Sequence, residues 1–163
     1  MRVITVGRVC VLVGAIVLGA SAWAEVGNGS LAGSGKFKAS GCGGNGGGIG
    51  VNLSLAANNT FSLSANGDVY TGTYSGTGTT FTFSLDQASM TQLGNTMAGD
   101  ATDLCGIVVT VSSVSVTSAS LKLNKTHTSA KLKFAARASG SGGGRSGSAT
   151  LQFKAGGAWN SAS

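Results

Sequence analysis

The fold is decided by residues 51–85, which read VNLSLAANNTFSLSANGDVYTGTYSGTGTTFTFSL. Apolar side chains recur there at every second position, as at Leu53 and Leu63, with Ser, Thr or Asn between them. This period places successive side chains on opposite faces of a β-strand. Turns interrupt the alternation at Asn58–Asn59 and Asn66–Gly67, and Asn-Gly is typical of a two-residue hairpin because both positions accept a positive φ. The stretch therefore predicts a meander of antiparallel strands.

The same alternation returns on both sides of this meander. Further short strands are expected at residues 36–39, 107–116, 121–123, 131–138 and 149–154. The small polar residues 25–35 predict a flexible N-terminal lead, and the glycine tract at 41–48 predicts a flexible loop.

One segment departs from the β pattern. Between residues 87 and 104 the apolar side chains recur at helical spacing, and Asp86 is placed to cap the first turn. Gly94 and Gly99 each cost about 1 kcal/mol in a helix interior, so either one helix or two short pieces is expected. The periodic positions are Met90, Leu93, Met97, Ala101 and Leu104.

The expected fold is a single all-β domain over residues 36–163. Eight or nine short strands joined mostly by hairpin-length loops suit an antiparallel up-and-down β-barrel or a β-sandwich, with one short helix. The hairpin of Gly72–Tyr74 and Phe81–Phe83 resembles hairpins of bacterial lipocalin-like barrels, which implies a barrel of that general shape. The resemblance covers a small part of the chain and carries over no functional residue.

The first 24 residues are typical of a bacterial export signal. Arg2 and Arg8 form a positive n-region, residues 9–20 form an apolar run, and Ala22–Ala24 form an A-x-A cleavage site. The sequence therefore predicts a signal peptide and a secreted or periplasmic protein. No later stretch reaches the roughly 20 apolar residues of a transmembrane helix, so none is expected after cleavage.

Export determines the expected state of the cysteines. Cys10 leaves with the signal peptide, and Cys42 and Cys105 then have one intramolecular pairing available in an oxidising compartment. A disulfide between them would close a long loop and stabilise the fold by about 4 kcal/mol. The alternative of two redox-active thiols lacks the C-x-x-C spacing that lowers a thiol pKa.

No catalytic, cofactor-binding or metal-binding residue is predicted, and a non-enzymatic role is expected. Gly41–Gly46 fits G-x-G-x-x-G by letter but leads into a strand, whereas a dinucleotide loop opens a helix. His127 is the chain's single histidine and lies in an expected turn, so it forms no multi-histidine metal site. Asp100 and Asp103 could form a calcium site or a carboxylate dyad, but a solvated helix face explains them more simply.

The cations form the one arrangement that suggests binding. The chain has 11 Lys or Arg and 5 Asp or Glu residues, and most of the cations alternate with apolar residues on the expected strands. They should therefore point outward. If the barrel closes, a possible anion-binding face forms from Lys36, Lys38, Lys122, Lys131, Lys133, Arg137 and Lys154. Outward lysines also keep β-proteins soluble and protect sheet edges, which is the alternative explanation.

The leading hypothesis is an exported non-enzymatic β-domain that binds a ligand or an anionic envelope component. Candidate partners are an anionic glycan, a lipid head group or a small apolar ligand. Nucleic acid is not expected, because the aromatic residues alternate onto the apolar faces. Two alternatives stay open: a structural or fibre subunit of the cell surface that adds strands to a neighbouring sheet, and a small outer-membrane barrel, although aromatic girdles are missing.

Overall fold

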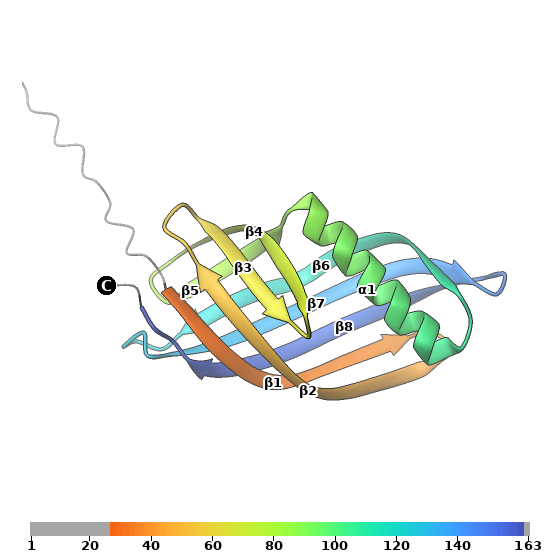
Figure 1. Ribbon diagram of the computed structural model, residues 1–163, viewed down its shortest axis with the longest axis horizontal. Coiled ribbons are helices and arrows are strands. Elements are labelled where there is room, and N and C mark those ends of the chain that lie inside the picture. Colours follow the sequence, from red (N-terminus) through yellow and green to blue (C-terminus); the bar gives the residue numbers. More distant parts are fainter. Residues whose placement is uncertain (1–26, 162–163) are drawn as a thin grey trace, which may run out of the picture.

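The structure, a computed structural model, describes residues 27–161, which form a closed antiparallel barrel and one helix. The eight strands follow the order of the chain around the barrel, and β1 closes it by pairing with β8 (Figure 1). The predicted up-and-down barrel is confirmed, and the sandwich alternative is wrong. The predicted signal peptide, residues 1–24, lies outside the described residues.

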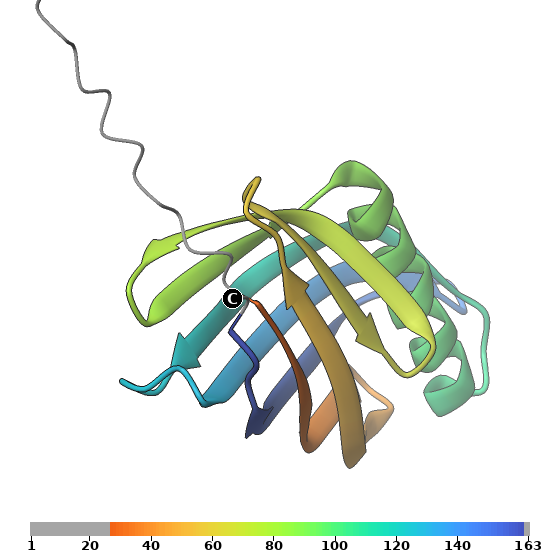
Figure 2. The same ribbon diagram turned by 60° about the vertical axis from the view of Figure 1, so that its left-hand side comes forward.

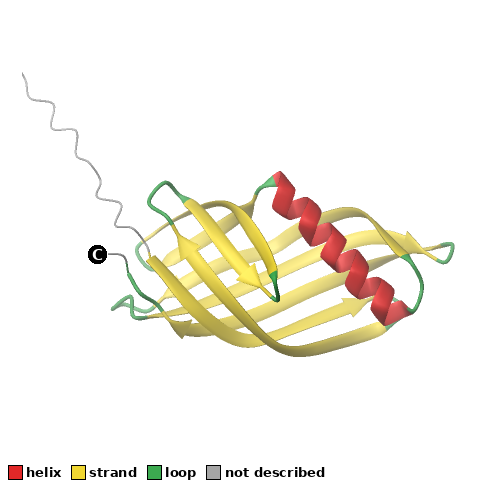
Figure 3. Cartoon of the chain, viewed as in Figure 1, coloured by secondary structure: helices red, strands yellow, loops and turns green. Residues whose placement is uncertain are grey.

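Short turns connect each strand or helix to the next (Figure 3). Asn66 and Gly67 have φ angles of 50° and 91°, so both central positions of the predicted hairpin turn are left-handed as that turn requires. The elements are β1 (Gly27–Ala39), β2 (Gly43–Leu55), β3 (Thr60–Ala65), β4 (Asp68–Thr77), β5 (Thr80–Leu85), α1 (Gln87–Cys105), β6 (Val109–Leu123), β7 (Ser129–Gly142) and β8 (Arg145–Ala158).

The wall of the barrel is uneven. The strands β3 and β5 have 6 residues each, whereas β1, β2, β6, β7 and β8 have 13 to 15. As a result, β2 pairs with β3 only through Val51–Leu55, and β5 pairs with β6 only through Thr80–Thr82. The long strands extend beyond the short ones, and α1 lies across this extension (Figure 2). We call the extension the glycine-rich end; it consists of residues 37–50, 109–116 and 136–149.

The centre of the barrel is filled by apolar side chains. The rings of Phe134 and Phe153 stack on adjacent strands with centroids 4.9 Å apart, and Phe61 meets Phe83 edge to face at the same distance. The sequence alternation therefore produces a packed core here. The largest fully buried side chains are Leu31, Val51, Leu53, Leu93, Met97, Leu121 and Leu132.

The helix α1 is continuous over 19 residues, so the single helix is confirmed and the two-piece alternative is wrong. The Asp86 carboxylate accepts a 2.8 Å hydrogen bond from the Ser89 backbone N–H, which is the predicted N-cap. Gly106 ends the helix in the left-handed region with a φ of 66°. The buried face of Leu93, Met97 and Ala101 offsets the low helix propensity of the two glycines.

The strand β6 keeps its apolar residues facing inward through two bulges. Its register against β7 shifts between Val111 and Ser113 and again between Val116 and Ser118. Each bulge inserts one residue, so the inward side passes from odd to even positions and back. The bulge hydroxyl of Thr117 donates to the Ala135 carbonyl at 3.2 Å. The two segments expected at 107–116 and 121–123 are therefore one strand, which begins at Val109 after Ile107 and Val108.

Two sequence predictions about the first strands are wrong. Residues 27–35, expected to be part of a flexible lead, belong to β1 and pair with both β2 and β8. Residues 43–48, expected to be a flexible loop, form the first half of β2 opposite β1. Strand pairing is made by backbone hydrogen bonds, and these need no apolar side chain once a neighbouring strand sets the register.

Candidate functional site

The structure places all seven predicted cations on the outer side of four adjacent strands, β6, β7, β8 and β1. Lys122 of β6 lies directly opposite Lys131 of β7, and Lys133 of β7 lies directly opposite Lys154 of β8. These seven residues, Lys36, Lys38, Lys122, Lys131, Lys133, Arg137 and Lys154, are called the basic face below. The spacing along each strand was visible in the sequence, but the pairing across strands required the register.

The other end of the basic face is organised around Thr150. This residue pairs with Arg137 on one side and with Lys38 on the other, and Gln152 pairs with Lys36. Neighbouring strands lie about 4.8 Å apart and alternate residues along a strand about 7 Å apart, so the cations form a regular grid. Polar side chains that can donate and accept hydrogen bonds lie between them.

The electrostatics of the basic face are unbalanced. Like charges directly opposite each other on neighbouring strands are destabilising, so the two lysine pairs reduce the stability of the fold. The acidic residues of the described chain lie elsewhere, at the β3–β4 turn and on or beside α1: Asp68, Asp86, Asp100 and Asp103. Charge is therefore segregated between the wall of long strands and the helix side of the barrel.

Hydrogen bonds to an acidic residue join the helix to the barrel on the opposite side from the basic face. The Asp68 carboxylate accepts hydrogen bonds from Gln92 at 3.0 Å, Thr96 at 3.0 Å and the Tyr70 hydroxyl at 3.1 Å, which ties α1 to the β3–β4 hairpin. Burial raises the pKa of Tyr70 to about 12, and Asp68 and Asp100 add to the rise. Burial also raises the pKa of Asp100, with smaller contributions from Asp103 and Asp68.

The carboxylates and the histidine considered as metal ligands do not meet at one site. Asp100 and Asp103 both lie near the end of α1, and His127 lies in the β6–β7 turn with a φ of 54°. Asn124 organises that turn: its side-chain oxygen accepts from the backbone N–H groups of Thr128 and Ser129. Among residues 27–161, no three His, Cys, Asp or Glu side chains lie close enough to hold a metal ion together.

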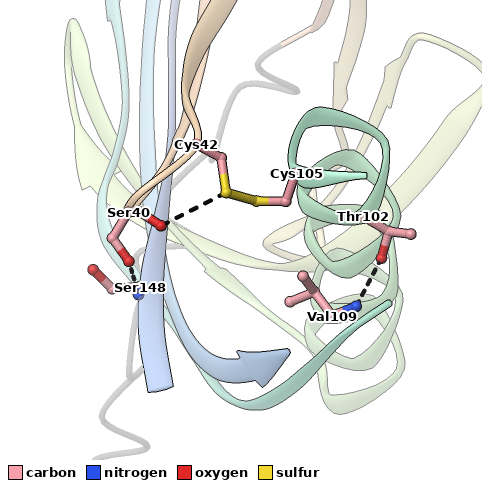
Figure 4. The surroundings of a disulfide bond; sticks show 6 residues. All are labelled: Ser40, Cys42, Thr102, Cys105, Val109 and Ser148. Carbon is pink, nitrogen blue, oxygen red and sulfur yellow. Dashed lines mark hydrogen bonds between the residues drawn. A yellow bond between two sulfur atoms is a disulfide. The ribbon is translucent and has the colours of Figure 1, made fainter. Parts of the chain in front are cut away.

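The predicted disulfide between Cys42 and Cys105 is present at the glycine-rich end (Figure 4). Its Cα atoms are 5.1 Å apart, and it joins the β1–β2 turn to the last residue of α1. Two hydrogen bonds support the same junction: the Val109 N–H donates to the Thr102 hydroxyl at 3.0 Å, and the Ser148 N–H donates to the Ser40 hydroxyl at 2.9 Å. The end of the helix is therefore fixed to the β1–β2 turn and to the start of β6, and the same turn is hydrogen-bonded to β8.

A cavity that the sequence analysis missed lies beside the disulfide. It has a volume of about 280 Å³ and opens at the glycine-rich end between α1 and the inner side of β6, β7 and β8. The signal that could have found it is residue size, because inward positions of β7 and β8 change there from Leu and Phe to Ala and Gly. The side chains and backbone that line it include Ala101, Val109, Val111, Ala138, Arg145 and Ala149.

Comparisons with known proteins returned no matching family model, no similar curated protein and no similar solved structure. Within residues 27–161, α1 is too polar to be a membrane-spanning helix. The interpretation of function therefore depends on the geometry of the basic face and of the cavity.

Proposed function

We propose that the protein is an exported, non-enzymatic binding domain whose basic face holds an acidic polysaccharide of the cell envelope. The observation that carries this proposal is a wall of cations in which lysines oppose lysines across β6–β7 and β7–β8. An anionic polymer lying across these strands would relieve the repulsion between them. A surface serving only solubility gains nothing from placing like charges opposite each other.

The remaining side chains of the wall favour a glycan over the other polyanions. At the outward positions of the described strands β6, β7, β8 and β1, the cations are interspersed only with Ser, Thr, Asn, Gln, Ala and Gly. A bilayer surface is usually engaged by apolar side chains as well as cations, and single-stranded nucleic acid by exposed aromatics. Hydroxyl and amide groups between cations suit a ligand that carries both carboxylates and hydroxyls.

The test measures retention on alginate, a linear carboxylated polysaccharide, at several salt concentrations. The double variant K133Q/K154Q removes two charges from the centre of the basic face. The matched control K125Q/R145Q removes two charges outside the basic face, one from the β6–β7 turn and one from the first residue of β8. We expect the first variant to bind at least about tenfold more weakly, with a shallower dependence on salt, and the control to bind as the wild type does.

The outcomes of this test separate the possible partners. Equal loss in both variants would show that net charge alone is responsible and would contradict the proposal. Retention on vesicles with anionic lipid, or on duplex DNA, without retention on alginate would replace the glycan by that partner. Absence of binding to all three would leave the lysines with a role in solubility only.

A second candidate function, self-assembly at the cell surface, is favoured by one specific observation. Residues 43–50 of β2 pair with β1 on one side and with no strand on the other, because β3 reaches only to Val51. An added Cβ at Gly47, Gly48 or Gly50 would meet nothing within 4 Å. This exposed edge has no lysine or proline, the residues that commonly prevent edge-to-edge pairing, so a second copy could add its own β2 there.

Sedimentation equilibrium over a range of concentrations tests this second candidate. The variant Gly48→Lys places a charge on the edge and should abolish self-association. Gly99→Lys, on α1 and equally open, is the matched control. A wild-type protein that stays monomeric at millimolar concentration would eliminate self-assembly through β2.

A further inference from the structure

The geometry points to a second binding site, the cavity beside the disulfide, for a small amphiphile with an aliphatic chain and an anionic head group. This site does not depend on the proposed function of the basic face. The basic face lies on the outer side of β7 and β8, whereas the cavity lies on their inner side, under α1.

The cavity exists because the residues that surround it are too small to fill it. Ala138 faces Ala149 across β7 and β8, where the corresponding inner pair farther along the same strands is Phe134 and Phe153. The disulfide and the hydrogen bond from Val109 to Thr102 hold the end of α1 in place over this gap. The helix therefore cannot move inward to close the space without breaking these connections.

The volume sets the size of the ligand. A dry cavity of about 150 Å³ lined by aliphatic and aromatic side chains holds a benzene ring. A volume of about 280 Å³ is roughly twice as large and suits a chain of about ten carbon atoms. The interior part of the lining is apolar, with Ala101, Val109 and Val111 among its residues, so a hydrocarbon chain would meet few unsatisfied polar groups.

The rim of the cavity sets the charge of the ligand. Arg145, at the β7–β8 turn, is the one charged residue that lines the cavity within the described chain, and Ser146 and Ser148 are nearby on the same strand. A guanidinium group binds carboxylate or phosphate through paired hydrogen bonds.

Two exposed aliphatic residues lie at the same opening. Ile107 lines the cavity and is 44% exposed, and its neighbour Val108 is 78% exposed. Large apolar side chains at the entrance of an apolar cavity would contact the part of a chain that extends outside it. The arrangement of apolar interior, apolar entrance and single cation matches a fatty acid or a similar anionic amphiphile.

Calorimetric titration with a series of carboxylates tests the assignment. Hexanoate, octanoate, decanoate and dodecanoate are used below their micelle concentrations. We expect affinity to rise about fourfold for each added CH₂ while the chain still enters the cavity, and then to level off near ten carbons. An affinity that does not depend on chain length would overturn the proposal.

Variants locate the binding. Ala138→Leu fills the cavity, and Ala135→Leu makes the same change on the outer side of the same strand. Octanoate binding should be lost in the first variant and retained in the second, with circular dichroism showing that both are folded. If both variants bind equally well, the ligand is not in the cavity and the proposal is wrong.

If Ala138→Leu does not fold, Arg145→Gln still tests the proposal. Arg145 is exposed beside the β7–β8 turn, so its replacement should not disturb folding. Octanoate should bind about tenfold more weakly to this variant, whereas uncharged 1-octanol should bind as it does to the wild type. An equal loss of affinity for the two ligands, or no loss for octanoate, would contradict the assignment of an anionic head group to the ligand. Alginate retention by Ala138→Leu should not change, which separates failure of this proposal from failure of the basic face.

Discussion

The middle of the barrel and its glycine-rich end are built from the same long strands but have different interiors. In the middle, inward positions hold residues such as Leu121, Leu132 and Phe153, and the space is filled. At the glycine-rich end, the inward positions of β7 and β8 hold Ala138, Gly140 and Ala149, and a cavity remains. The pairing of β7 with β8 is continuous through both regions, so along these two strands the size of the inward side chains decides whether the space is filled.

Removal of the disulfide should have the largest effect on stability and should act first at the glycine-rich end. Replacing Cys42 and Cys105 together by serine removes a crosslink over a sequence separation of 63 residues and should lower the free energy of unfolding by about 4 kcal/mol. Urea denaturation measures the loss. Hydrogen exchange should show that the end of α1 opens before the middle of the barrel does. Uniform loss of protection across the barrel would contradict a locally constrained end.

The next largest effect on stability is expected when an inward side chain is truncated in the filled middle rather than beside the cavity. Leu121→Ala, in the filled middle, should lower the free energy of unfolding by about 3 kcal/mol, because it leaves a new void in a packed core. Val111→Ala, beside the cavity, should cost about 1 kcal/mol or less, because its side chain already borders empty space. Equal losses in denaturant unfolding would show that the cavity end is packed as tightly as the middle.

The features that the sequence predicted correctly are those controlled by local residues. Asn66–Gly67 defines its hairpin because both positions must take a positive φ, and Asp86 caps α1 through its own side chain. Alternation along each strand was sufficient to place the lysines outside. The disulfide followed from having two cysteines outside the predicted signal peptide.

The features that were missed depend on partners far away in the sequence. Residues 27–35 and 43–48 carry too few apolar side chains to predict a strand, and they form one because β8 and β1 supply backbone partners. The pair Lys122–Lys131 required the register of β6 against β7, and the pair Lys133–Lys154 required that of β7 against β8. The cavity required knowing which small residues of β7 and β8 meet beneath α1.

A smaller effect on the free energy of unfolding is expected at alkaline pH. It comes from Tyr70, on the side of the barrel where α1 contacts the filled middle. The pKa of Tyr70 is raised by burial from 10.0 to about 12, so below pH 10 its hydroxyl is protonated in both the folded and the unfolded chain. Between pH 10 and 12 only the unfolded chain ionises, and the free energy of unfolding should fall. We expect a loss of about 1 kcal/mol, less than the full linkage value because solvent screens the nearby charges.

Tyr70→Phe is the matched variant for this titration, since it keeps the ring and removes the proton. The difference in stability between wild type and variant should depend on pH between 10 and 12 and be constant below pH 9. Burial also raises the pKa of Tyr74, so the variant should retain part of the alkaline loss. A constant difference across the whole range would show that Tyr70 ionises as readily in the folded chain as in the unfolded one.

The smallest expected effect lies on the outer side of the same strands. Lys133 faces Lys154, so Lys133→Gln should raise the free energy of unfolding by about 0.2–1 kcal/mol at low salt, and high salt should remove the gain. Lys36 faces Gln152, so Lys36→Gln removes the same charge without relieving a directly opposed pair and should gain less. Thermal unfolding at two salt concentrations measures both variants. If Lys133→Gln is stabilised no more than Lys36→Gln, the lysine pair carries no repulsion for a bound polyanion to relieve, and the main argument for the basic face as a binding surface would be lost.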